Sequence, residues 1–513
     1  MSYVKSKDSK RLEFDDAIDQ TGFGKYNIGV LATCCLLILA MYLDIFGFSV
    51  VLPAVACDMK LTTAQQGLLS AMPLIGVMIS SYGWGLCADT LGRRRTLLIA
   101  MPVGAVLNMA ASLAPTYATL ATLKFLSACF TSSANAAAFV LVGESAPRRV
   151  RSRFMFLMAS ATMVVQLIIC AFALPIFQLT FKIHISWLSL MYVPWRLLLQ
   201  VISLPGVVGS ISMLAVYESP KFLLSQGREE ETMDVLRTMY SWNVGGSKDT
   251  FPVASVYLEE LATTTDTGGV KIGFLRRMWN QTAPLFKPPL LTNSLKLYYI
   301  LLCAYMTSTG YTMWVPTMIN AYFDEENSSG QSFCQVASRA ASAHVIDHPD
   351  PKVLLDCNRA IQPLTLYAVM VYSGCSTVFS ILLSFLVGPV GKKRTTLLVF
   401  VIAAFSGVLL LFVKIPLLSI GLFYVFLYVA LILGNINTYL VELNPTHLRG
   451  MATCLSVVVA RGFGFFSVQL IATLLADHCT PMVSGYVALV ISGFLVSTFL
   501  PPDEKSKNIS SST

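Results

Sequence analysis

Charged residues are scarce in this chain of 513 residues. Asp, Glu, Lys and Arg together make up 12% of it, whereas about 25% is usual for a soluble domain. Hydrophobic residues make up 55%, and the mean hydropathy is +0.66. Folded in water, such a chain would expose too much apolar surface, which excludes a soluble globular protein. The net charge of +8 therefore has to be placed relative to a membrane and does not indicate nucleic-acid binding.

Signatures of catalysis are also missing. We find no nucleophile elbow, no phosphate-binding loop and no cluster of metal ligands, so we expect neither an enzyme nor a cofactor or metal site. Residues 1–26 lack the apolar core and small-residue cleavage site of a signal peptide. We therefore expect the first spanning helix to direct membrane insertion itself.

Long apolar stretches recur along the chain, each about the 20 residues that a helix needs to cross the hydrocarbon core. Those of the first half lie near 28–53, 66–87, 96–114, 118–142, 154–179 and 193–216. Those of the second half lie near 293–319, 363–387, 395–413, 416–440, 451–475 and 481–500. Only helices satisfy their own backbone groups in lipid. We predict an all-α membrane protein with twelve transmembrane helices in two pseudo-symmetric six-helix bundles.

Basic residues gather in alternate loops. They are Arg93, Arg94, Arg95, Arg148, Arg149, Arg151, Arg153, Lys392, Lys393, Arg394 and Arg449. Because positively charged loops tend to stay in the cytoplasm, we expect these loops and both termini there, in a plasma membrane or an intracellular vesicle membrane. The predicted parts are a cytoplasmic N-terminus 1–27, a bundle 28–216, a cytoplasmic inter-bundle loop 217–292, a bundle 293–500 with an extracytoplasmic loop 320–362, and a cytoplasmic tail 501–513.

The extracytoplasmic loop offers two candidate modifications. Asn327 begins an Asn-Ser-Ser sequon and is a candidate for glycosylation. Cys334 and Cys357 share this loop in an oxidising compartment. They form either a disulfide with each other or two free thiols.

Two unrelated segments of the first half recur in the second. Residues 144–151 recur as 442–449, with Glu, Pro and Arg all offset by 298 positions. Residues 85–95 recur more weakly as 384–394, with Gly92 and Gly391 offset by 299. Since both repeats fall in matching loops at nearly one offset, the chain is a parallel duplication of six spans.

The first copy of the weaker repeat carries a family resemblance. The spacing of Gly85, Asp89, Gly92, Arg93 and Arg94 resembles the loop signature of the major facilitator superfamily. The segment 217–221, Tyr-Glu-Ser-Pro-Lys, resembles the Pro-Glu-Ser-Pro-Arg motif of its sugar and organic-ion branches.

Within those branches, residues 14–26, Asp44 and the segment 314–316 are similar to the synaptic vesicle glycoprotein 2 group. We expect this chain to differ from the vesicle glycoproteins in lacking their long N-terminus and in having the short loop 320–362 in place of their large luminal domain.

The resemblance implies a cytoplasmic gate. Ion networks within each half would latch the two halves in an outward-open state and release as the halves rock. Alternatively, the arginines only set topology, although this does not explain the acidic residues at fixed spacing beside them. The predicted gate comprises Gly85, Asp89, Gly92, Arg93, Arg94, Glu144, Arg151, Glu442 and Arg449.

Among the charged side chains inside predicted spans, Asp44, Lys124 and Arg461 stand out, because a charge at mid-bilayer costs about 2.5–3.5 kcal/mol on insertion scales. From the helical rise, Asp44 lies roughly 14 Å and Lys124 roughly 9 Å from the outer ends of their spans. A lysine side chain reaches across that difference, so the two residues can pair. The resemblance to proton-coupled sugar carriers implies that the pair couples solute to protons, and the alternative is a structural ion pair.

Two further residues complete the candidate substrate site. Organic anion carriers also place an arginine in span eleven, so Arg461 implies an anionic or zwitterionic substrate by resemblance. Alternatively, helix C-termini or backbone carbonyls satisfy it. Trp314 either lines the cavity or packs within the bundle.

The sequence therefore predicts a secondary active or facilitative carrier of a small organic solute, working by alternating access. We expect the solute, protons and the lipid bilayer as partners, no nucleic acid, and a monomer. The alternative is a non-transporting protein, similar to the vesicle glycoproteins, that regulates secretory vesicles through partner binding.

Overall fold

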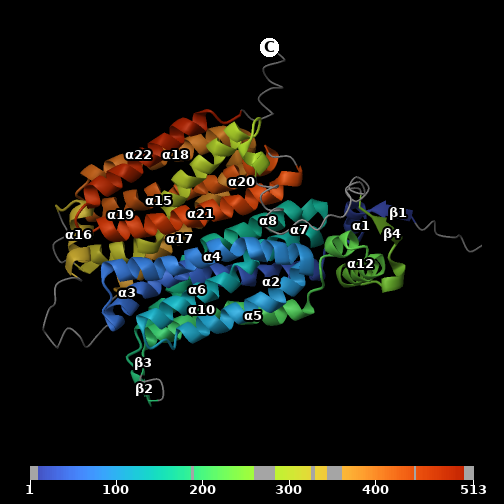
Figure 1. The fold of residues 1–513 in the computed structure, drawn as a ribbon, viewed down its shortest axis with the longest axis horizontal. Coiled ribbons are helices and arrows are strands. Elements are labelled where there is room, and N and C mark those ends of the chain that lie inside the picture. The colour runs from blue at the N-terminus through green and yellow to red at the C-terminus, as the bar shows by residue number, and fades with distance from the viewer. Residues whose placement is uncertain are drawn as a thin grey trace, which may run out of the picture.

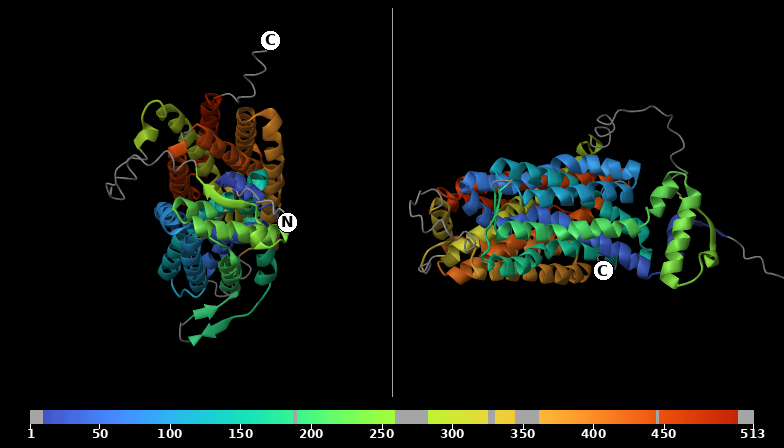
Figure 2. Two further views of the ribbon diagram at one scale, coloured as in Figure 1. Left: turned by 90° about the vertical axis from the view of Figure 1, so that its right-hand side faces the viewer. Right: turned by 90° about the horizontal axis from the view of Figure 1, so that it is seen from below.

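The computed structural model describes residues 10–186, 190–258, 283–324, 330–343, 361–443 and 446–501. Within them, long helices run roughly parallel in two bundles that lie side by side (Figures 1 and 2). The first bundle comes from the blue-to-green part of the chain and the second from the yellow-to-red part. This arrangement agrees with the predicted duplication.

The first bundle contains six helical segments within the described residues, four of them built from more than one helix. They are α2 (Lys25–Tyr42) with η1 (Leu43–Gly47) and α3 (Phe48–Met59), α4 (Thr63–Leu91), α5 (Arg93–Ala111), α6 (Tyr117–Thr131) with α7 (Ser133–Ser145), α8 (Arg148–Met163) with α9 (Val165–Phe177), and α10 (Pro194–Ser212), which η3 (Met213–Ala215) extends.

The second bundle repeats this order in the described part of its sequence. Its segments are α15 (Leu291–Asp324), α17 (Pro363–Val390), α18 (Lys392–Phe412), α19 (Pro416–Leu427) with η8 (Tyr428–Ile432) and α20 (Leu433–Glu442), α21 (Thr446–Leu474), and α22 (Cys479–Thr498). Each predicted apolar stretch thus lies in a helical segment.

By length and apolarity alone, nine helices of the described chain could cross a membrane, or ten if the bent pair α8 and α9 counts as one span. The two remaining segments are less apolar for visible reasons. α5 begins with three arginines, and α15 carries a run of Tyr, Thr and Ser side chains between Tyr298 and Thr312. α15 packs among the helices of its bundle, whereas α5 has an outer face on which Ile99, Val103 and Val106 are exposed.

A glycine of the repeat forms the same turn in both bundles. Gly92 separates α4 from α5 with φ +104°, and Gly391 separates α17 from α18 with φ +96°. Other residues rarely adopt this conformation, whereas glycine does so without steric cost. The backbone conformation that this turn requires therefore explains why both copies of the repeat carry a glycine here.

Four helix pairs join the two bundles most closely: α4 packs along α21, α9 and α8 pack along α17, and α3 packs against α15. In each pair one helix comes from the first half and its partner from the second. A side chain on these faces can therefore contact both halves.

One end of the molecule carries a small additional unit, which we call the cap. Strand β1 (Lys10–Glu13) pairs in parallel with β4 (Val253–Tyr257) (Figure 1). Helix α1 (Phe14–Gln20) packs against both strands and against α12 (Glu229–Val244), which also contacts α11 (Pro220–Ser225) and η4 (Lys248–Thr250). The predicted division treated the N-terminus 1–27 and the loop 217–292 as separate parts. In the structure they share a sheet at the end where the arginines of α5 and α8 lie, which we call the basic end.

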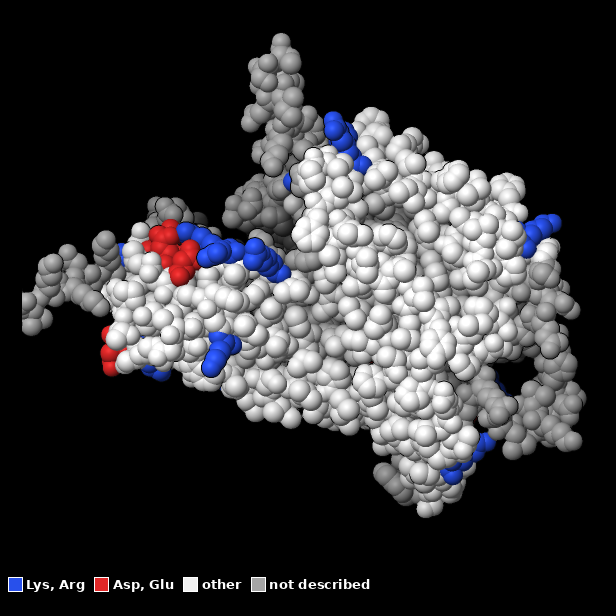
Figure 3. Space-filling model, turned by 180° about the vertical axis from the view of Figure 1, so that it is seen from behind, with Lys and Arg blue, Asp and Glu red and all other residues white. Residues whose placement is uncertain are grey.

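The opposite end carries the hairpin of β2 (Ile183–Ile185) and β3 (Leu190–Tyr192), and the short helix α16 (Phe333–Ala343). Figure 3 shows charged side chains gathered at the two ends, with a broad belt of uncharged surface between them on this face. A belt of this kind is what a lipid-facing surface requires.

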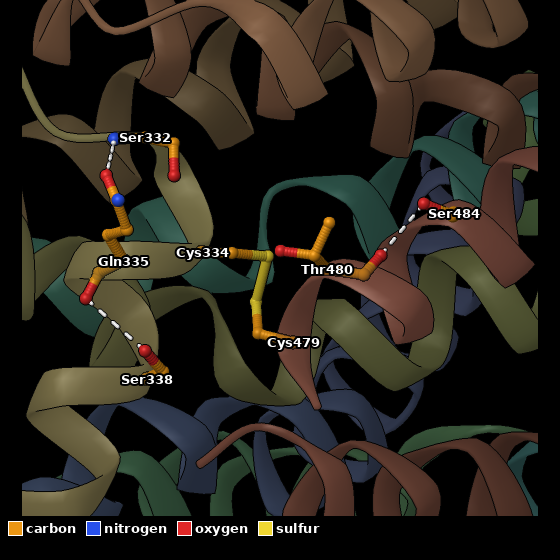
Figure 4. Close-up of a disulfide and its surroundings, with 7 residues drawn as sticks. All are labelled: Ser332, Cys334, Gln335, Ser338, Cys479, Thr480 and Ser484. Atoms are coloured by element: carbon orange, nitrogen blue, oxygen red, sulfur yellow. Dashed lines mark hydrogen bonds between the residues drawn. A yellow bond between two sulfur atoms is a disulfide. The ribbon is translucent and has the colours of Figure 1, made fainter. Parts of the chain in front are cut away.

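The predicted disulfide between Cys334 and Cys357 is wrong. Cys334 instead bonds to Cys479 at the start of α22, with the two Cα atoms 5.4 Å apart (Figure 4). The backbone N–H of Ser332 donates to the side chain of Gln335 at the start of α16, and this helix packs against α22. The packing of α16 against α22, and not membership of one loop, thus determines the disulfide partner of Cys334. Cys57, at the end of α3, is also disulfide-bonded.

Candidate substrate and coupling site

Asp44 and Lys124 form a buried ion pair, as their predicted depths required. The carboxylate of Asp44 is 1% exposed and the ammonium of Lys124 is fully buried. Lys124 also donates to the backbone carbonyl of Asp44 at 2.8 Å and to Asn108 Oδ1 at 3.1 Å, and lies 4.9 Å from the Phe48 ring. The pair is therefore enclosed in the first bundle by the first, third and fourth spans.

The second oxygen of the carboxylate has two donors of its own. Ser127 Oγ donates to Asp44 Oδ2 at 2.7 Å, and Thr131 Oγ1 donates to the same atom at 3.2 Å. Ser127 and Thr131 follow Lys124 by three and seven residues on α6, so all three side chains lie on one helix face. Hydrogen bonds to the ionised carboxylate favour its charged form.

A small cavity adjoins the pair between α2, α5, α6 and α10. Its polar lining is Asp44, Asn108, Thr131 and Ser203. Polar groups around a small space are the setting in which a protein holds buried water. Such water would give the carboxylate a partner for proton exchange.

Asp44 sits in η1, a π-helical turn within an otherwise α-helical span. Insertions of this kind are rare and occur frequently at functional sites. Tyr42, the last residue of α2, and Phe46 of the turn both lie toward the second bundle, with their rings stacked at 5.8 Å.

Arg461 of α21 lies against these two rings. Its guanidinium carbon is 5.6 Å from the centres of both the Tyr42 and the Phe46 ring, and one of its nitrogens is 3.4 Å from the Tyr42 hydroxyl. The residue is 5% exposed, and its Nε has no hydrogen-bond partner. Arg461, which belongs to the second bundle, thus contacts the span of the first bundle that carries Asp44.

Trp314 packs within the bundle. It is 1% exposed, and its indole N–H donates to the backbone carbonyl of Val468 at 3.3 Å. A side chain added at Gly67 of α4 would lie 3.6 Å from it. In this structure Trp314 therefore belongs to the packing between α4, α15 and α21, which was one of its two predicted roles.

At the basic end, Arg93 is the centre of the predicted network in the first half. It pairs with Asp89 at 3.3 Å and with Glu144 at 3.1 Å, and lies 5.0 Å from the Phe222 ring. Ser219 also donates to Glu144. All these partners belong to the first bundle or the cap, so the role of the network as a latch between the two halves stays a prediction.

The segment after span six explains why position 92 is occupied by a glycine. Glu218 accepts hydrogen bonds from the backbone N–H groups of Arg94 at 2.8 Å and Arg95 at 3.3 Å, and so satisfies free N–H groups at the start of α5. A Cβ at Gly92 would come within 2.5 Å of the Glu218 carboxylate. Sequence analysis identified this motif but missed the partners of Glu218 and Ser219. Gly85 lies partly exposed in α4.

Arg151 was predicted to join the network with Glu144, but it contacts the cap instead. It pairs with Asp15 of α1 at 2.8 Å and donates to the Ala146 carbonyl at 3.3 Å. Partial burial raises the pKa of Asp15, but the hydrogen bond and the positive charge of Arg151 outweigh it and hold this pKa below its ordinary value of 3.8. Arg148 contacts Asp16 of the same helix at 2.8 Å.

Contacts cannot be given for four of the predicted residues. The side chains of Glu442 and Arg449, and residues Asn327 and Cys357, lie outside the part of the chain that the structure describes. The second-half gate and the glycosylation site therefore stay predictions.

Two six-helix bundles related by an internal repeat, with paired helices along their interface, are an architecture of secondary transporters. The chain belongs to the Major Facilitator Superfamily, whose family model matches residues 34–468. It is thus an integral multi-pass membrane protein of a transporter family.

Among curated proteins, the chain is 23% identical over 337 residues to synaptic vesicle glycoprotein 2B of Rattus norvegicus, covering 62% of this chain and 49% of that protein. It is 23% identical over 335 residues to synaptic vesicle glycoprotein 2A of Homo sapiens, covering 61% of this chain and 44% of that protein. The matched region thus spans about half the length of these relatives.

Among solved structures, the fold is similar to the xylose transporter XylE of E. coli in a partially occluded inward open conformation. The TM-score is 0.63 at 14% identity, covering 93% of this chain and all of that one. A bacterial homolog of the human lysosomal transporter Spinster gives a TM-score of 0.59 at 12% identity, covering 93% and 98%. At these identities the likeness shows the fold alone.

Proposed function

We propose that the protein is a secondary carrier that moves a small organic solute by alternating access and couples this movement to a proton at Asp44. The observation that carries the proposal is the Asp44–Lys124 pair, buried in the first bundle on a span that also touches the second. Charged groups inside a membrane bundle are costly, and those that are retained mark substrate and proton pathways.

The contacts of the pair suggest how coupling works. A proton on Asp44 cancels the ion pair and leaves Lys124 charged, with the Asp44 carbonyl and Asn108 as its acceptors. Leaving one buried charge uncompensated costs about 3–5 kcal/mol. That cost favours a rearrangement of η1 against α6, and η1 also borders Arg461 of the other half. Solute and proton can thus act on the same turn.

The test separates coupling from a structural ion pair. Asp44→Asn should abolish pH-dependent solute uptake into proteoliposomes. It also leaves Lys124 without its counter-ion, so we expect a loss of stability of a few kcal/mol. The double variant Asp44→Asn with Lys124→Met removes both charges and should recover most of that stability while uptake stays independent of pH. A pH dependence unchanged in the double variant would contradict the proposal.

A milder variant measures the carboxylate directly. Thr131→Val removes one hydrogen bond to the ionised form of Asp44 without changing any charge. Because this bond favours the ionised carboxylate, its loss should move the midpoint of the pH-dependent uptake to higher pH. A purely structural pair predicts no shift of this midpoint.

The second candidate is a protein that regulates secretory vesicles through partners and transports nothing. It is favoured by the names of the curated relatives, which are synaptic vesicle glycoproteins. Against it, the match covers about half of those proteins, and the buried charges have no use in a partner-binding role. Absence of any solute-dependent proton movement in proteoliposomes, with partners bound by the cap, would favour this candidate.

The placement in the membrane is part of the proposal. With the basic end in the cytoplasm, the cap and both termini face the cytoplasm, and the Cys334–Cys479 disulfide faces the oxidising side.

A further inference from the structure

We propose that the hairpin of β2 and β3 is a membrane anchor, whose apolar face lies in the lipid leaflet at the end of the molecule opposite the cap. The hairpin joins α9 to α10 and takes no part in the proposed coupling site. The inference therefore does not depend on the carrier function.

The hairpin extends sideways from the first bundle. In Figures 1 and 2 it projects beyond α5 and α10, on the side that faces away from the second bundle. The span that begins directly after it, Pro194–Ala215, has 22 residues and is thus about 33 Å long, close to the thickness of the hydrocarbon core. The hairpin therefore lies at the edge of that core, over the area that lipid occupies around the bundle.

The two helices next to the hairpin have apolar outer faces. Their exposed side chains recur every three or four residues, so on each helix they form one stripe. They are Ile99, Val103 and Val106 on α5, and Leu204, Val208 and Ile211 on α10. Such stripes on a membrane-spanning helix face lipid, so the hairpin begins where this lipid-facing surface ends.

The strands of the hairpin carry their apolar side chains on one face. Ile183 pairs with Tyr192, and Ile185 pairs with Leu190, in antiparallel register, so these four side chains point to the same side. Phe181 joins them, because its ring stacks on that of Tyr192 with the centres 5.9 Å apart. We call these five residues the apolar face.

The opposite face is more polar. It carries Lys182, His184 and Met191, all of them exposed, and of these only Met191 is apolar. On the apolar face, by contrast, Ile183 is 56% exposed. A two-stranded hairpin by itself is at best marginally stable in water, and contact with lipid stabilises it by removing its apolar face from water.

A hydrogen bond shows which way the apolar face points. The Tyr192 hydroxyl donates to Gln200 Oε1 at 2.8 Å. Gln200 follows Pro194, the first residue of α10, by six positions, which places it about 9 Å along this helix into the span. Tyr192 therefore points along α10 toward the membrane, and the side chains on its face do the same. Lys182 and His184 consequently point toward water.

The first turn of α10 holds the base of the hairpin in this orientation. Trp195 donates to the carboxylate of Asp58 at 3.1 Å, close to the end of α3. Arg196 donates to the carbonyls of Ser112 and Ala114, both at 2.8 Å, just after the end of α5. Because the base is bound to two other spans, the apolar face stays turned toward the leaflet.

The experiment places a photo-crosslinking residue at single positions of the full chain. The residue is p-benzoylphenylalanine, and the chain is reconstituted in phosphatidylcholine liposomes in which part of the lipid carries an alkyne on an acyl chain. Positions 181 and 183 should crosslink to this lipid, whereas positions 182 and 184 should do so weakly. Transfer of one large apolar side chain from water to lipid favours the buried state at least about tenfold, so we expect a ratio of that order between positions 183 and 184.

A pair of charge variants tests whether the apolar face causes the contact. Ile183→Asp puts a carboxylate on that face and should lower lipid crosslinking from position 181 severalfold. His184→Asp puts the same carboxylate on the opposite face and is the matched control, which should leave crosslinking from position 181 unchanged.

Several outcomes would overturn the proposal. Equal lipid crosslinking at all four positions, or none at 181 and 183, contradicts the anchor. Crosslinks from 183 to a second copy of the chain would make the apolar face a contact between copies, and crosslinks to α5 or α10 would show that the hairpin folds back onto the bundle. If the variant at 183 does not fold, the comparison of positions 181 and 182 decides in the same way.

Discussion

Gly92 shows how much can depend on one residue without a side chain. It holds φ +104° between α4 and α5, and the carboxylate of Glu218 occupies the place where a Cβ would lie. Gly92→Ala combines backbone strain of about 1–2 kcal/mol with displacement of the acceptor that satisfies the start of α5.

We expect Gly92→Ala to lower the thermal midpoint in detergent, measured with a thiol-reactive dye. Gly83→Ala is the control, since Gly83 lies in the same helix with open space around its Cα, and alanine favours helices. Equal midpoints for the two variants would show that Glu218 adapts to a side chain at position 92.

At the same scale, the Asp44–Lys124 pair could be predicted from sequence, whereas the residues around it could be predicted only in part. Asp44 and Lys124 were found because charge is rare in spans and because helical rise fixes depth. Ser127 and Thr131 share the face of Lys124 and could have been found from that spacing. Asn108 lies on another span, and helix order alone does not show which faces of two spans meet.

At the scale of elements, the π-helical turn η1 is the feature that the sequence did not reveal. Its five residues follow the same apolar pattern as the rest of the span, so periodicity does not distinguish them. In the structure, the turn presents Asp44 to the first bundle and two rings to Arg461. The proposed proton site and the contact with Arg461 thus lie on two sides of this part of the span.

The cap is a second element-level finding. Its strands come from segments far apart in the sequence, and a pair of short strands has little signal of its own. The side chain of Asn243 joins it to the first bundle, because it donates to the carbonyls of Thr21 and Gly22 and to Asn27, and accepts from the Tyr26 N–H at 3.1 Å. From the sequence, the N-terminus and this loop were predicted as separate parts.

The Asp15–Arg151 pair gives the cap a predictable response to pH. Because the pKa of Asp15 is below its ordinary 3.8, the charged form is favoured in the folded state, and the stabilisation is present above that value and lost as pH falls through the lowered pKa. Asp15→Asn should cost about 1 kcal/mol or less, since the pair is partly solvated.

The difference in thermal midpoint between wild type and Asp15→Asn should stay constant from pH 8 to pH 5 and narrow only toward and below pH 3.8. Asp249→Asn, at an exposed site of the cap that lacks an arginine partner among the described contacts, serves as the control. A difference that disappears between pH 7 and 6 would point to another titrating group.

For the whole molecule, the two bundles and their order could be predicted because lipid requires every span to be long, apolar and helical. How the loops pack over the ends is not constrained in this way, which is why Cys334 was assigned to the wrong partner. The observed disulfide joins segments separated by 145 residues and fixes α16 to α22.

Reduction of this bond, or Cys479→Ser, should lower the free energy of unfolding by about 2–5 kcal/mol. Cys375→Ser, which changes an exposed free cysteine, should have little effect. In sealed vesicles, a membrane-impermeant reductant should cleave the bond only from the side opposite the cap. Cleavage from the cap side would reverse the proposed orientation.

The pairing of β1 with β4 also has a consequence for how the protein is made. Residues 10–13 leave the ribosome first, but their partner strand, 253–257, emerges only after all six spans of the first bundle. Until then β1 is unpaired, and Phe14 and Ile18, which are buried in the finished cap, are not yet covered by it. If one span fails to insert, the two strands end on opposite sides of the bilayer and never meet. An open cap would then mark a wrongly threaded chain for chaperones and proteases, before the second half is complete.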